Sequence, residues 1–339
     1  MAREYNVAIM GATGAVGKEL LSIVEERKFP VKNLKLLASE RSVGKEMVYQ
    51  GRKLKVELLD SNSFRGVDIV LASAGASISK QFRKDMADAK ALCIDNTSAF
   101  RMEPDVPLVV PEINPEDCRW NKGIIANPNC TTIIAIVPMK PIHDAAKIKR
   151  MVISSYQAAS GAGDKAMFEV QQQAKDWAAG NPLKVEKFAY QLLWNVIPHI
   201  DVFTENGYTK EEMKVVNETR KIMHAPEMMI SSTTVRVPVL RAHSESIMIE
   251  TEKKLSVEDI KNLLKNAPGV TLEDDPANKK YPMPLFASGK DNVFVGRIRE
   301  DISCSGNGYC LWVAGDQIRK GAALNAVQIA EIVHKEGLK

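Results

Sequence analysis

The feature that most constrains this chain is a glycine-rich turn near its start, Gly11-Ala12-Thr13-Gly14-Ala15-Val16-Gly17. It follows an apolar run of strand length, Tyr5–Met10, and leads into Val16–Arg27, where apolar residues recur at helical spacing. Such glycines permit a tight turn and let backbone N–H groups reach a pyrophosphate at the helix N-terminus, where the dipole favours an anion. Any tight strand-to-helix turn can use glycines, so the position in the first strand–helix unit is what favours nucleotide binding.

The first third of the chain alternates strand-like and helix-like segments. Three further strands are expected: Leu34–Ala38, Asp68–Ala72 and Leu92–Asp95. Ile78–Ala91 is polar and favours a helix, and the alternation predicts a parallel sheet with helices on its faces. Two β-rich pieces within residues 45–59 flank Gln50-Gly51 and predict a hairpin at the edge of that sheet.

The composition changes at Asn127-Pro128-Asn129, where an expected strand ends and the apolar helix Thr132–Met139 begins. Longer strands are expected beyond it: Met151–Tyr156, Thr233–Val239, Ser246–Glu250 and Asn292–Ile298. Helices are expected at Lys165–Ala178, Glu211–His224, Val257–Leu264 (with the capping pair Ser256 and Asp259) and Ile318–Lys335. This half predicts an α+β layer architecture.

A length of 339 residues suits two domains of about 150 residues each. We expect residues 1–127 and 316–339 to form a dinucleotide-binding domain, with a catalytic and dimerisation domain, residues 128–315, inserted between them. The fold class is therefore α/β, a Rossmann-type domain followed by an α+β domain.

Composition excludes several classes of protein. The formal net charge is +4 without long basic runs, which argues against a nucleic-acid partner. The five cysteines show neither a C-x-x-C motif nor the spacing of a zinc site, so we expect no disulfide scaffold and no metal. This use of cysteine is typical of a protein of the reducing cytoplasm. A signal peptide and a membrane span are not indicated.

The end of the second strand bears on the choice of dinucleotide. An acid there typically holds the ribose hydroxyls of NAD, and Glu40 is nearby. Arg41 and Ser42 instead offer a cation and a hydroxyl, which suit a 2′-phosphate, so we expect NADP. The alternative is a solvated polar loop.

Cys130 lies at the expected first turn of the apolar helix, where backbone N–H groups and the helix dipole would stabilise a thiolate or an oxyanion. Single cysteines are more often buried structural residues, as we expect for Cys93. A thiolate beside a nicotinamide implies addition to an aldehyde, hydride loss and an acyl-thioester. Such chemistry needs a proton shuttle, and His243, in a strand-rich stretch with two arginines, is the candidate; the alternative is a surface histidine.

Together these residues resemble the aspartate-semialdehyde dehydrogenase family over the whole chain. The resemblance is carried by GATGAVG, NTSAFRM (96–102), PNCTT (128–132), SYQAASGAG (155–163), EEMKVVNETRKI (211–222), RVPVLRAHS (236–244) and GDQIRKGAALNAVQIAE. It implies a Rossmann domain with a catalytic domain of the glyceraldehyde-3-phosphate dehydrogenase type, and a homodimer or homotetramer. The implied reaction reduces L-aspartyl-4-phosphate to L-aspartate 4-semialdehyde with NADPH and releases phosphate, for lysine, threonine, methionine and diaminopimelate synthesis.

The resemblance also implies residue roles. Cys130 would be the nucleophile, His243 the general acid/base, and Gln157 would orient the substrate. The implied cofactor contacts are Gly11, Thr13, Gly14, Ala15, Val16, Arg41, Ser42, Ser160, Gly161 and Gln317. The implied substrate and phosphate contacts are Ser98, Arg101, Asn129, Glu211, Lys214 and Arg236.

Some of these implied roles leave alternatives open. Glu212 competes with Glu211 for the substrate ammonium, Arg101 could be a surface residue, and Glu211 with Lys214 could be a solvated ion pair.

Three other functions compete with this reading. The N-acetyl-γ-glutamyl-phosphate reductase family shares fold and chemistry, but it usually has Gly where this chain has Asn129 and lacks RVPVLRAHS in this form. A non-enzymatic NADP-binding regulator would have lost the cysteine or the histidine. A cofactor-free cysteine hydrolase leaves the glycine turn unexplained.

Overall fold

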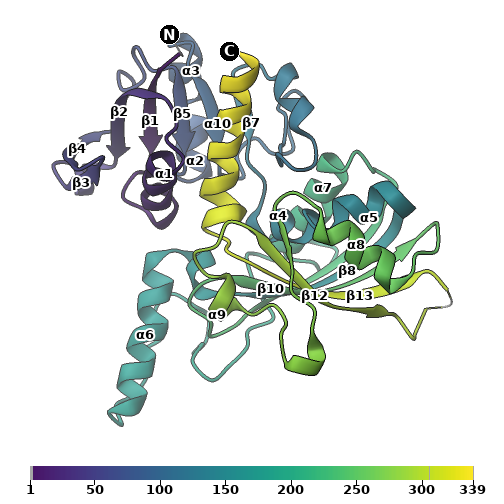
Figure 1. Cartoon of the computed structure of the whole chain (residues 1–339). Coiled ribbons are helices and arrows are strands. Elements are labelled where there is room, and N and C mark those ends of the chain that lie inside the picture. Colours follow the sequence, from purple (N-terminus) through teal and green to yellow (C-terminus); the bar gives the residue numbers. More distant parts are fainter. Residues whose placement is uncertain (1–2, 305, 339) are drawn as a thin grey trace. The chain divides into compact units, whose positions relative to one another are not determined.

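A computed structural model describes residues 3–304 and 306–338, and the chain divides into two compact units (Figure 1). Unit 1 comprises Met1–Asn129 and Ala322–Lys339, and unit 2 comprises Cys130–Gly321. The sequence predicts boundaries after residues 127 and 315, whereas the units divide after residues 129 and 321. The second boundary differs because residues 316 and 317 hydrogen-bond residues 241 and 242 of unit 2.

Unit 1 is built on one mixed, mainly parallel sheet, here called sheet 1. Its strands are β1 (Tyr5–Met10), β2 (Val31–Ala38), β3 (Glu46–Tyr49), β4 (Arg52–Leu58), β5 (Ile69–Ala72), β6 (Leu92–Asp95) and β7 (Ile124–Ala126), in the order β3-β4-β2-β1-β5-β6-β7. Every pairing is parallel except β3 with β4. The strand–helix alternation of the sequence is thus confirmed.

The edge hairpin of sheet 1 is also confirmed. Gln50 and Gly51 join β3 to β4 with φ values of +49° and +72°. Two successive residues with positive φ are the signature of the type I′ turn, whose twist matches that of the flanking strands.

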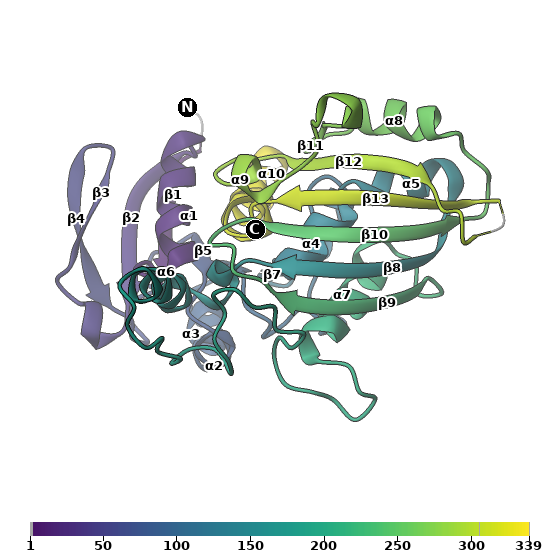
Figure 2. The ribbon, with the colours of Figure 1, turned by 90° about the horizontal axis from the view of Figure 1, so that it is seen from below.

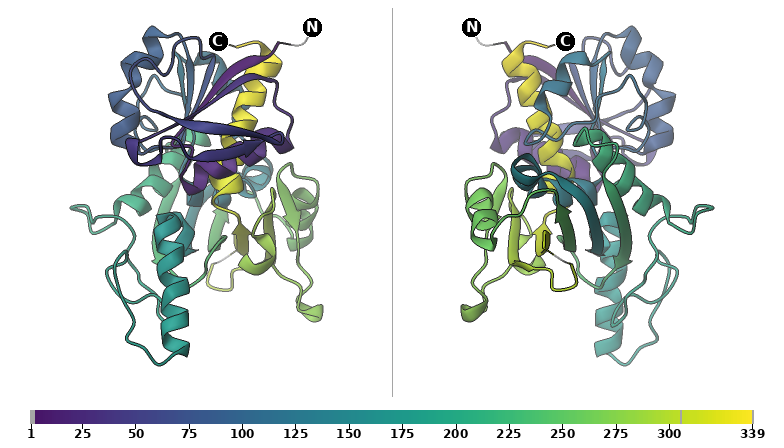
Figure 3. Two further views of the ribbon diagram at one scale, coloured as in Figure 1. Left: turned by 90° about the vertical axis from the view of Figure 1, so that its left-hand side faces the viewer. Right: turned by 90° about the vertical axis from the view of Figure 1, so that its right-hand side faces the viewer.

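Helices cover both faces of sheet 1. They are α1 (Ala15–Glu26), α2 (Ala76–Gln81), α3 (Arg83–Asp88) and α10 (Leu324–Glu336), with short turns η1 (Glu40–Ser42) and η2 (Pro115–Trp120). α1 and α10 pack on one face and α2 and α3 on the other (Figure 3). The single helix expected over residues 78–91 is wrong: it is two helices, divided at Phe82, whose buried ring packs on Phe64.

Unit 2 is built on a mixed sheet, here called sheet 2. Its strands are β8 (Ile148–Gln157), β9 (Met229–Arg236), β10 (His243–Thr251), β11 (Val270–Leu272), β12 (Val293–Glu300) and β13 (Gly308–Gly315). Figure 2 shows them side by side in the order β11-β12-β13-β10-β8-β9. β9 ends at Arg236, before the predicted residue 239.

Helices of unit 2 lie mainly on one face of sheet 2 (Figure 1). The helices are α4 (Cys130–Ile136), α5 (Met139–Ala146), α6 (Asp164–Ala178), α7 (Lys210–Ile222), α8 (Val257–Lys265) and α9 (Pro284–Ala287), and the short turns are η3 (Ala159–Ala162) and η4 (Pro276–Asn278). The capping box of Ser256 and Asp259 on α8 is confirmed. The helix expected at 132–139 is instead the pair α4 and α5, and the helix expected from residue 318 begins with a π-turn, η5 (Arg319–Ala323).

Candidate active site

The glycine turn of unit 1 follows β1 and opens α1. Gly11 has φ +89°, and a Cβ there would lie 2.8 Å from the carbonyl of Ser73, while a Cβ on Gly17 would lie 2.2 Å from the Gly11 oxygen. Gly14 has an ordinary φ of −77°. A Cβ there would lie 3.5 Å from the Gly11 oxygen, its nearest contact among the described residues apart from its chain neighbours. Folding therefore requires Gly11 and Gly17, whereas Gly14 leaves bare backbone at a helix N-terminus, which fits a pyrophosphate.

The end of β2 lies beside this turn. The hydroxyl of Thr13 donates to that of Ser42 at 3.2 Å, and Arg41 is exposed in the same short turn. A cavity of about 450 Å³ next to Thr13 is lined in part by Lys18 and Lys45. These two lysines were not among the sequence candidates, because neither lies in a recognisable motif.

In unit 2, Cys130 and His243 lie side by side. Cys130 lies in the first turn of α4, as expected, and is its first residue, two positions before the predicted start; its Sγ lies 3.6 Å from Nε2 of His243. His243 begins β10 and is fully buried. Its Nδ1 accepts a hydrogen bond of 3.0 Å from the backbone N–H of Ala158. Two residues 113 positions apart are thus brought into one pair.

The backbone bond of Ala158 fixes the tautomer of His243. Because Nδ1 is the acceptor, the neutral ring carries its proton on Nε2, the nitrogen that faces Cys130. Burial, assisted by the charge of Arg236, lowers the pKa of the His243 imidazole well below its ordinary value of 6.5. The ring is therefore neutral near pH 7 and presents an N–H to the sulfur.

Arg236 lies next to this pair. It ends β9, it is buried, and its Nη1 donates to the carbonyl of Ala158 at 2.6 Å. A Cβ on Gly161 would lie 2.9 Å from Nη1 of Arg236 and 3.2 Å from Cε1 of His243. Burial lowers the pKa of the Arg236 guanidinium, and Glu211 partly opposes that shift. The guanidinium stays charged and is available to a carboxylate.

The structure distinguishes the two glutamates of α7. Glu212 completes a capping box: its Oε2 accepts from the N–H of Thr209 at 2.7 Å. Its Oε1 accepts from the N–H of Thr234 at 2.9 Å. Both carboxylate oxygens of Glu212 thus hold the fold together, which leaves Glu211 as the candidate for a substrate cation.

Glu211 pairs with Lys214, whose Nζ lies 3.0 Å from Glu211 and 2.8 Å from Asp201. Burial disfavours the ammonium, but the two carboxylates outweigh it and raise the pKa of Lys214. The pair is therefore not a solvated surface contact. Asp201 was missed, because it lies in an irregular segment outside any motif.

Gln157 ends β8, and its amide nitrogen donates to the hydroxyls of Thr131 at 2.7 Å and Ser155 at 3.3 Å. Directly opposite Ser155 in the β8–β10 register is Glu245, a fully buried acid whose carboxylate oxygens have no hydrogen-bond partner among the described residues. Burial raises the pKa of Glu245 well above its ordinary value. No sequence motif points to this acid.

Two of the implied cofactor residues of unit 2, Gln317 and Ser160, contact each other. The amide oxygen of Gln317 accepts from the N–H of Ala242 at 2.8 Å, and its nitrogen donates to the hydroxyl of Ser160. Both ends of this amide are therefore engaged within unit 2.

Unit 1 carries the other three phosphate candidates. Arg101 is buried, not a surface residue, and it donates to the carbonyl of Asn127 at 2.9 Å and to that of Asn96 at 2.7 Å. Asn129 is buried and Ser98 is exposed. Backbone carbonyls thus hold the Arg101 side chain in place.

The other cysteines differ from Cys130. Burial raises the pKa of the Cys93 thiol well above its usual value and that of Cys118 to about 12. All five cysteines lie in the described residues, where no disulfide joins them. The expectation of a buried, inert Cys93 is confirmed.

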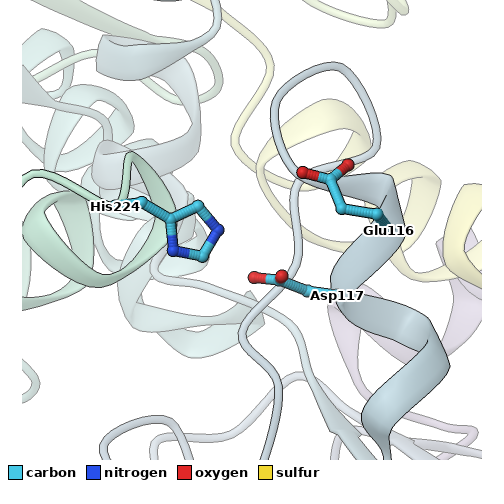
Figure 4. Close-up of side chains that lie close together, drawn as sticks. All are labelled: Glu116, Asp117 and His224. Atoms are coloured by element: carbon cyan, nitrogen blue, oxygen red, sulfur yellow. The ribbon is translucent and has the colours of Figure 1, made fainter.

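Figure 4 draws three further polar side chains. Glu116 and Asp117 both lie on η2 of unit 1, where Asp117 accepts from Asn114 at 2.7 Å, and His224 follows α7 in unit 2. They come from different units, and a pair of acids alone does not make a metal site, so we assign no ion to them.

A bare glycine turn at a helix N-terminus in unit 1, and a thiol beside a neutral histidine in unit 2, are the features expected of a nucleotide-dependent dehydrogenase that uses a cysteine. Residues 6–120 match the semialdehyde dehydrogenase NAD binding domain, and residues 139–320 match the semialdehyde dehydrogenase dimerisation domain.

Full-length relatives agree. The aspartate-semialdehyde dehydrogenase of Aquifex aeolicus is 55% identical over 98% of this chain and 99% of its own, and that of Bacillus subtilis is 48% identical over 100% of both. A solved structure of aspartate semialdehyde dehydrogenase II from Vibrio cholerae, complexed with ASA, matches with a TM-score of 0.95 and 44% identity over 99% of each chain. The chain belongs to the aspartate-semialdehyde dehydrogenase family.

Family membership makes the chain an oxidoreductase with a nicotinamide-nucleotide domain and a dimerisation domain. It also favours this function over the N-acetyl-γ-glutamyl-phosphate reductase alternative. Within the described residues, no helix combines the length and apolar character needed to cross a membrane.

Proposed function

We propose that this chain reduces L-aspartyl-4-phosphate to L-aspartate 4-semialdehyde through an acyl-thioester on Cys130. The main support is that Sγ of Cys130 lies 3.6 Å from Nε2 of His243, while Nδ1 of the same ring accepts a hydrogen bond from the backbone N–H of Ala158. The thiolate attacks the acyl carbon, the carbon–oxygen bond to phosphate breaks, and phosphate leaves with the bonding pair. Bound NADPH supplies the hydride that takes the thioester to the aldehyde level, and the carbon–sulfur bond then breaks to restore the thiolate.

His243 acts in this scheme from its neutral form. Its Nε2–H can donate first to the thiolate and then to the oxygen that gains negative charge when the acyl carbon becomes tetrahedral. Accepting a proton at Nε2 would require the ring to move its own proton to Nδ1 and lose the bond from Ala158. The geometry therefore favours hydrogen-bond donation by His243 over proton shuttling.

Charged side chains would recognise the substrate. Arg236, buried and charged, would pair with the α-carboxylate, and Glu211 would pair with the ammonium. Glu212 is engaged in its capping box, which supports this choice. Lys214 would hold the phosphate, and Gln157 would orient the acyl group near the sulfur.

The three unit 1 candidates, Ser98, Arg101 and Asn129, complete the proposed phosphate contacts. The support for Arg101 is its burial together with its two carbonyl partners, which would hold a guanidinium ready for an anion.

Unit 1 would hold the nucleotide at the glycine turn. Thr13, Gly14, Ala15 and Val16 lie at or beside the N-terminus of α1, and Gly14 leaves room for a pyrophosphate. Ser42 and the exposed Arg41 would bind the 2′-phosphate, which gives preference for NADP over NAD. Ser160 and Gly161 of unit 2 would contact the nicotinamide side.

We further propose a cytoplasmic homodimer or homotetramer assembled through unit 2. The face of sheet 2 away from α4 and α7 exposes Tyr156, which packs on Trp312 at 5.4 Å, together with Met248. A second apolar area carries Trp177 and Trp194, each more than half exposed. Large exposed aromatic side chains of this kind are typical of surfaces that bind another protein.

The reverse reaction provides the test. Purified enzyme would receive aspartate semialdehyde, inorganic phosphate and NADP⁺, and absorbance of the reduced cofactor would be followed. We expect a signal that requires phosphate and that is much weaker with N-acetylglutamate semialdehyde. A folded enzyme that gives no phosphate-dependent signal, or that prefers the acetylated substrate, would contradict the proposed function.

A further inference from the structure

The segment Asp316–Gly321, which follows β13, is organised by one buried carboxylate. Oδ1 of Asp316 accepts the backbone N–H groups of Ile318 at 2.9 Å and Arg319 at 3.0 Å. Its Oδ2 accepts from Nε of Arg241 at 2.6 Å and from a backbone N–H in the loop after α9 at 2.6 Å. Charge-assisted bonds to a fully buried carboxylate are strong, so the segment is firmly held.

Gln317, next in this segment, reaches the backbone on both sides of His243. Its amide oxygen accepts from Ala242, the residue directly before His243, at 2.8 Å. Its amide nitrogen donates to the hydroxyl of Ser160, two residues after Ala158, whose N–H binds Nδ1 of the imidazole. One side chain thus ties together the two stretches of backbone that orient the ring.

Ala242 needs such a contact. Its φ is +72°, in the left-handed region that disfavours residues with a Cβ, and it is fully buried. Its N–H is the group that Gln317 accepts. Loss of this bond would let Ala242 relax toward an ordinary conformation and turn His243 with it.

Gly321, at the other end of the segment, lies against Cys130. Its N–H bonds to the carbonyl of Asp316 at 3.0 Å across the π-turn. A Cβ on Gly321 would lie 2.8 Å from Cβ and 3.2 Å from Cα of Cys130. These atoms of Cys130 cannot move aside by rotating a side chain, so the glycine is required for this approach.

We infer that Gln317 and Gly321 are positioning residues that together set the distance between Sγ of Cys130 and Nε2 of His243. The inference deepens the proposed function, which assigns the chemistry to that pair. It adds a structural role to the cofactor contact that the sequence resemblance implies for Gln317, because the bonds to Ala242 and Ser160 use one N–H and one lone pair of its amide.

The test measures alkylation of Cys130 by iodoacetamide in enzyme without cofactor or substrate, followed by the mass of the peptide that contains Cys130. Gln317→Met keeps the side-chain length and removes both hydrogen bonds. Because the displaced His243 no longer donates to the thiolate, we expect alkylation at pH 7 to slow about fivefold and kcat to fall about tenfold or more. KM for the semialdehyde should stay within about twofold. Gln328→Met on α10, whose amide bonds Glu112, is the matched control and should alkylate at the wild-type rate.

Two further variants complete the test. Ala242→Gly, which tolerates a positive φ, should restore at least half of the lost alkylation rate in the Gln317→Met background. Gly321→Ala should slow alkylation by displacing Cys130, and it tests the inference even if Gln317→Met does not fold.

Three outcomes would overturn the inference: wild-type alkylation in folded Gln317→Met, a raised KM for NADP⁺ with unchanged alkylation, or no restoration by Ala242→Gly. Because the assay uses neither substrate nor cofactor, its result stands whether or not the enzyme acts on aspartate semialdehyde.

Discussion

Sheet 1 and sheet 2 carry their functional groups in different places. The central strands of sheet 1 are apolar and buried along their length, as at Ile9 and Ile94, and its candidate nucleotide-binding groups lie in the turns that follow β1 and β2. Sheet 2 instead carries polar side chains within its strands, among them Gln157, His243 and Glu245, all of them buried.

The difference separates two ways of building a site. At the glycine turn that follows β1, the absence of Cβ atoms exposes backbone N–H groups to a ligand, so the local shape of the backbone matters most there. In sheet 2, buried polar side chains form the candidate site, and their burial changes their pKa values, as for His243. Substitutions should therefore act on binding and shape in one unit and on chemistry and titration in the other.

The largest effect is expected at the reacting side chain of unit 2. Cys130→Ser replaces the thiol with a weaker nucleophile and a poorer leaving group, and kcat should fall about 10⁴-fold or more while NADP⁺ still binds. Steady-state kinetics and cofactor titration measure the two effects. Cys304→Ser, a half-buried cysteine with no assigned role, is the control. Near-normal turnover in Cys130→Ser would remove the nucleophile from the mechanism.

The glycine turn of unit 1 should separate shape from binding. A Cβ on Gly17 would lie 2.2 Å from a backbone oxygen, so Gly17→Ala should destabilise the protein by about 3 kcal/mol. In Gly14→Ala the new Cβ would lie 3.5 Å from its nearest atom, so the variant should keep the wild-type melting temperature. Because the Cβ would crowd the pyrophosphate, the KM for NADP⁺ should rise about tenfold. Equal loss of stability in both variants would show that all three glycines serve folding.

Glu245 should make the stability of the protein depend on pH. Its pKa is raised by burial in the folded state, so the unfolded chain releases this proton near pH 4.5 while the folded chain keeps it. Stability is therefore lost as pH rises above 4.5, by about 1.4 kcal/mol per pH unit until the folded carboxyl ionises. Glu245→Gln removes this slope, and its stability advantage over wild type should grow from pH 5 to pH 7 in thermal melts.

The control for that slope is Glu252→Gln, because Glu252 is exposed. Its melting temperature should differ from that of wild type by the same amount at every pH. A constant difference for Glu245→Gln as well would mean that the buried carboxyl ionises in the folded protein, and that the interior of sheet 2 is more polar than its packing indicates.

The smallest effect is expected at the end of β2. Arg41→Ala should lower the ratio of kcat/KM for NADP⁺ to that for NAD⁺ by about tenfold, because one cation near the 2′-phosphate is lost. Arg52→Ala, an exposed arginine on β4, should leave the ratio unchanged. An unchanged ratio in Arg41→Ala would show that the loop does not read the 2′-phosphate.

The sequence by itself determined what depends on near neighbours. The glycine turn, the hairpin at Gln50-Gly51, the capping box at Ser256 and the start of a helix at Cys130 are all set by contacts within a few residues, so local patterns predict them. Periodicity failed at Phe82, where the backbone departs from helical geometry (φ −95°, ψ +6°) and divides the predicted helix into two.

Only the tertiary structure decided how the site works. The Glu212 carboxylate accepts a hydrogen bond from the N–H of Thr234, 22 residues away in the sequence. The tautomer of His243 is set by the hydrogen bond from the N–H of Ala158, 85 residues away. Gly321 lies against Cys130, the residue at the other end of the unit 2 sequence, and packing that excludes water raises the pKa of Glu245. A local pattern carries no information about such partners, because burial and hydrogen bonds between distant residues exist only once the sheets have formed.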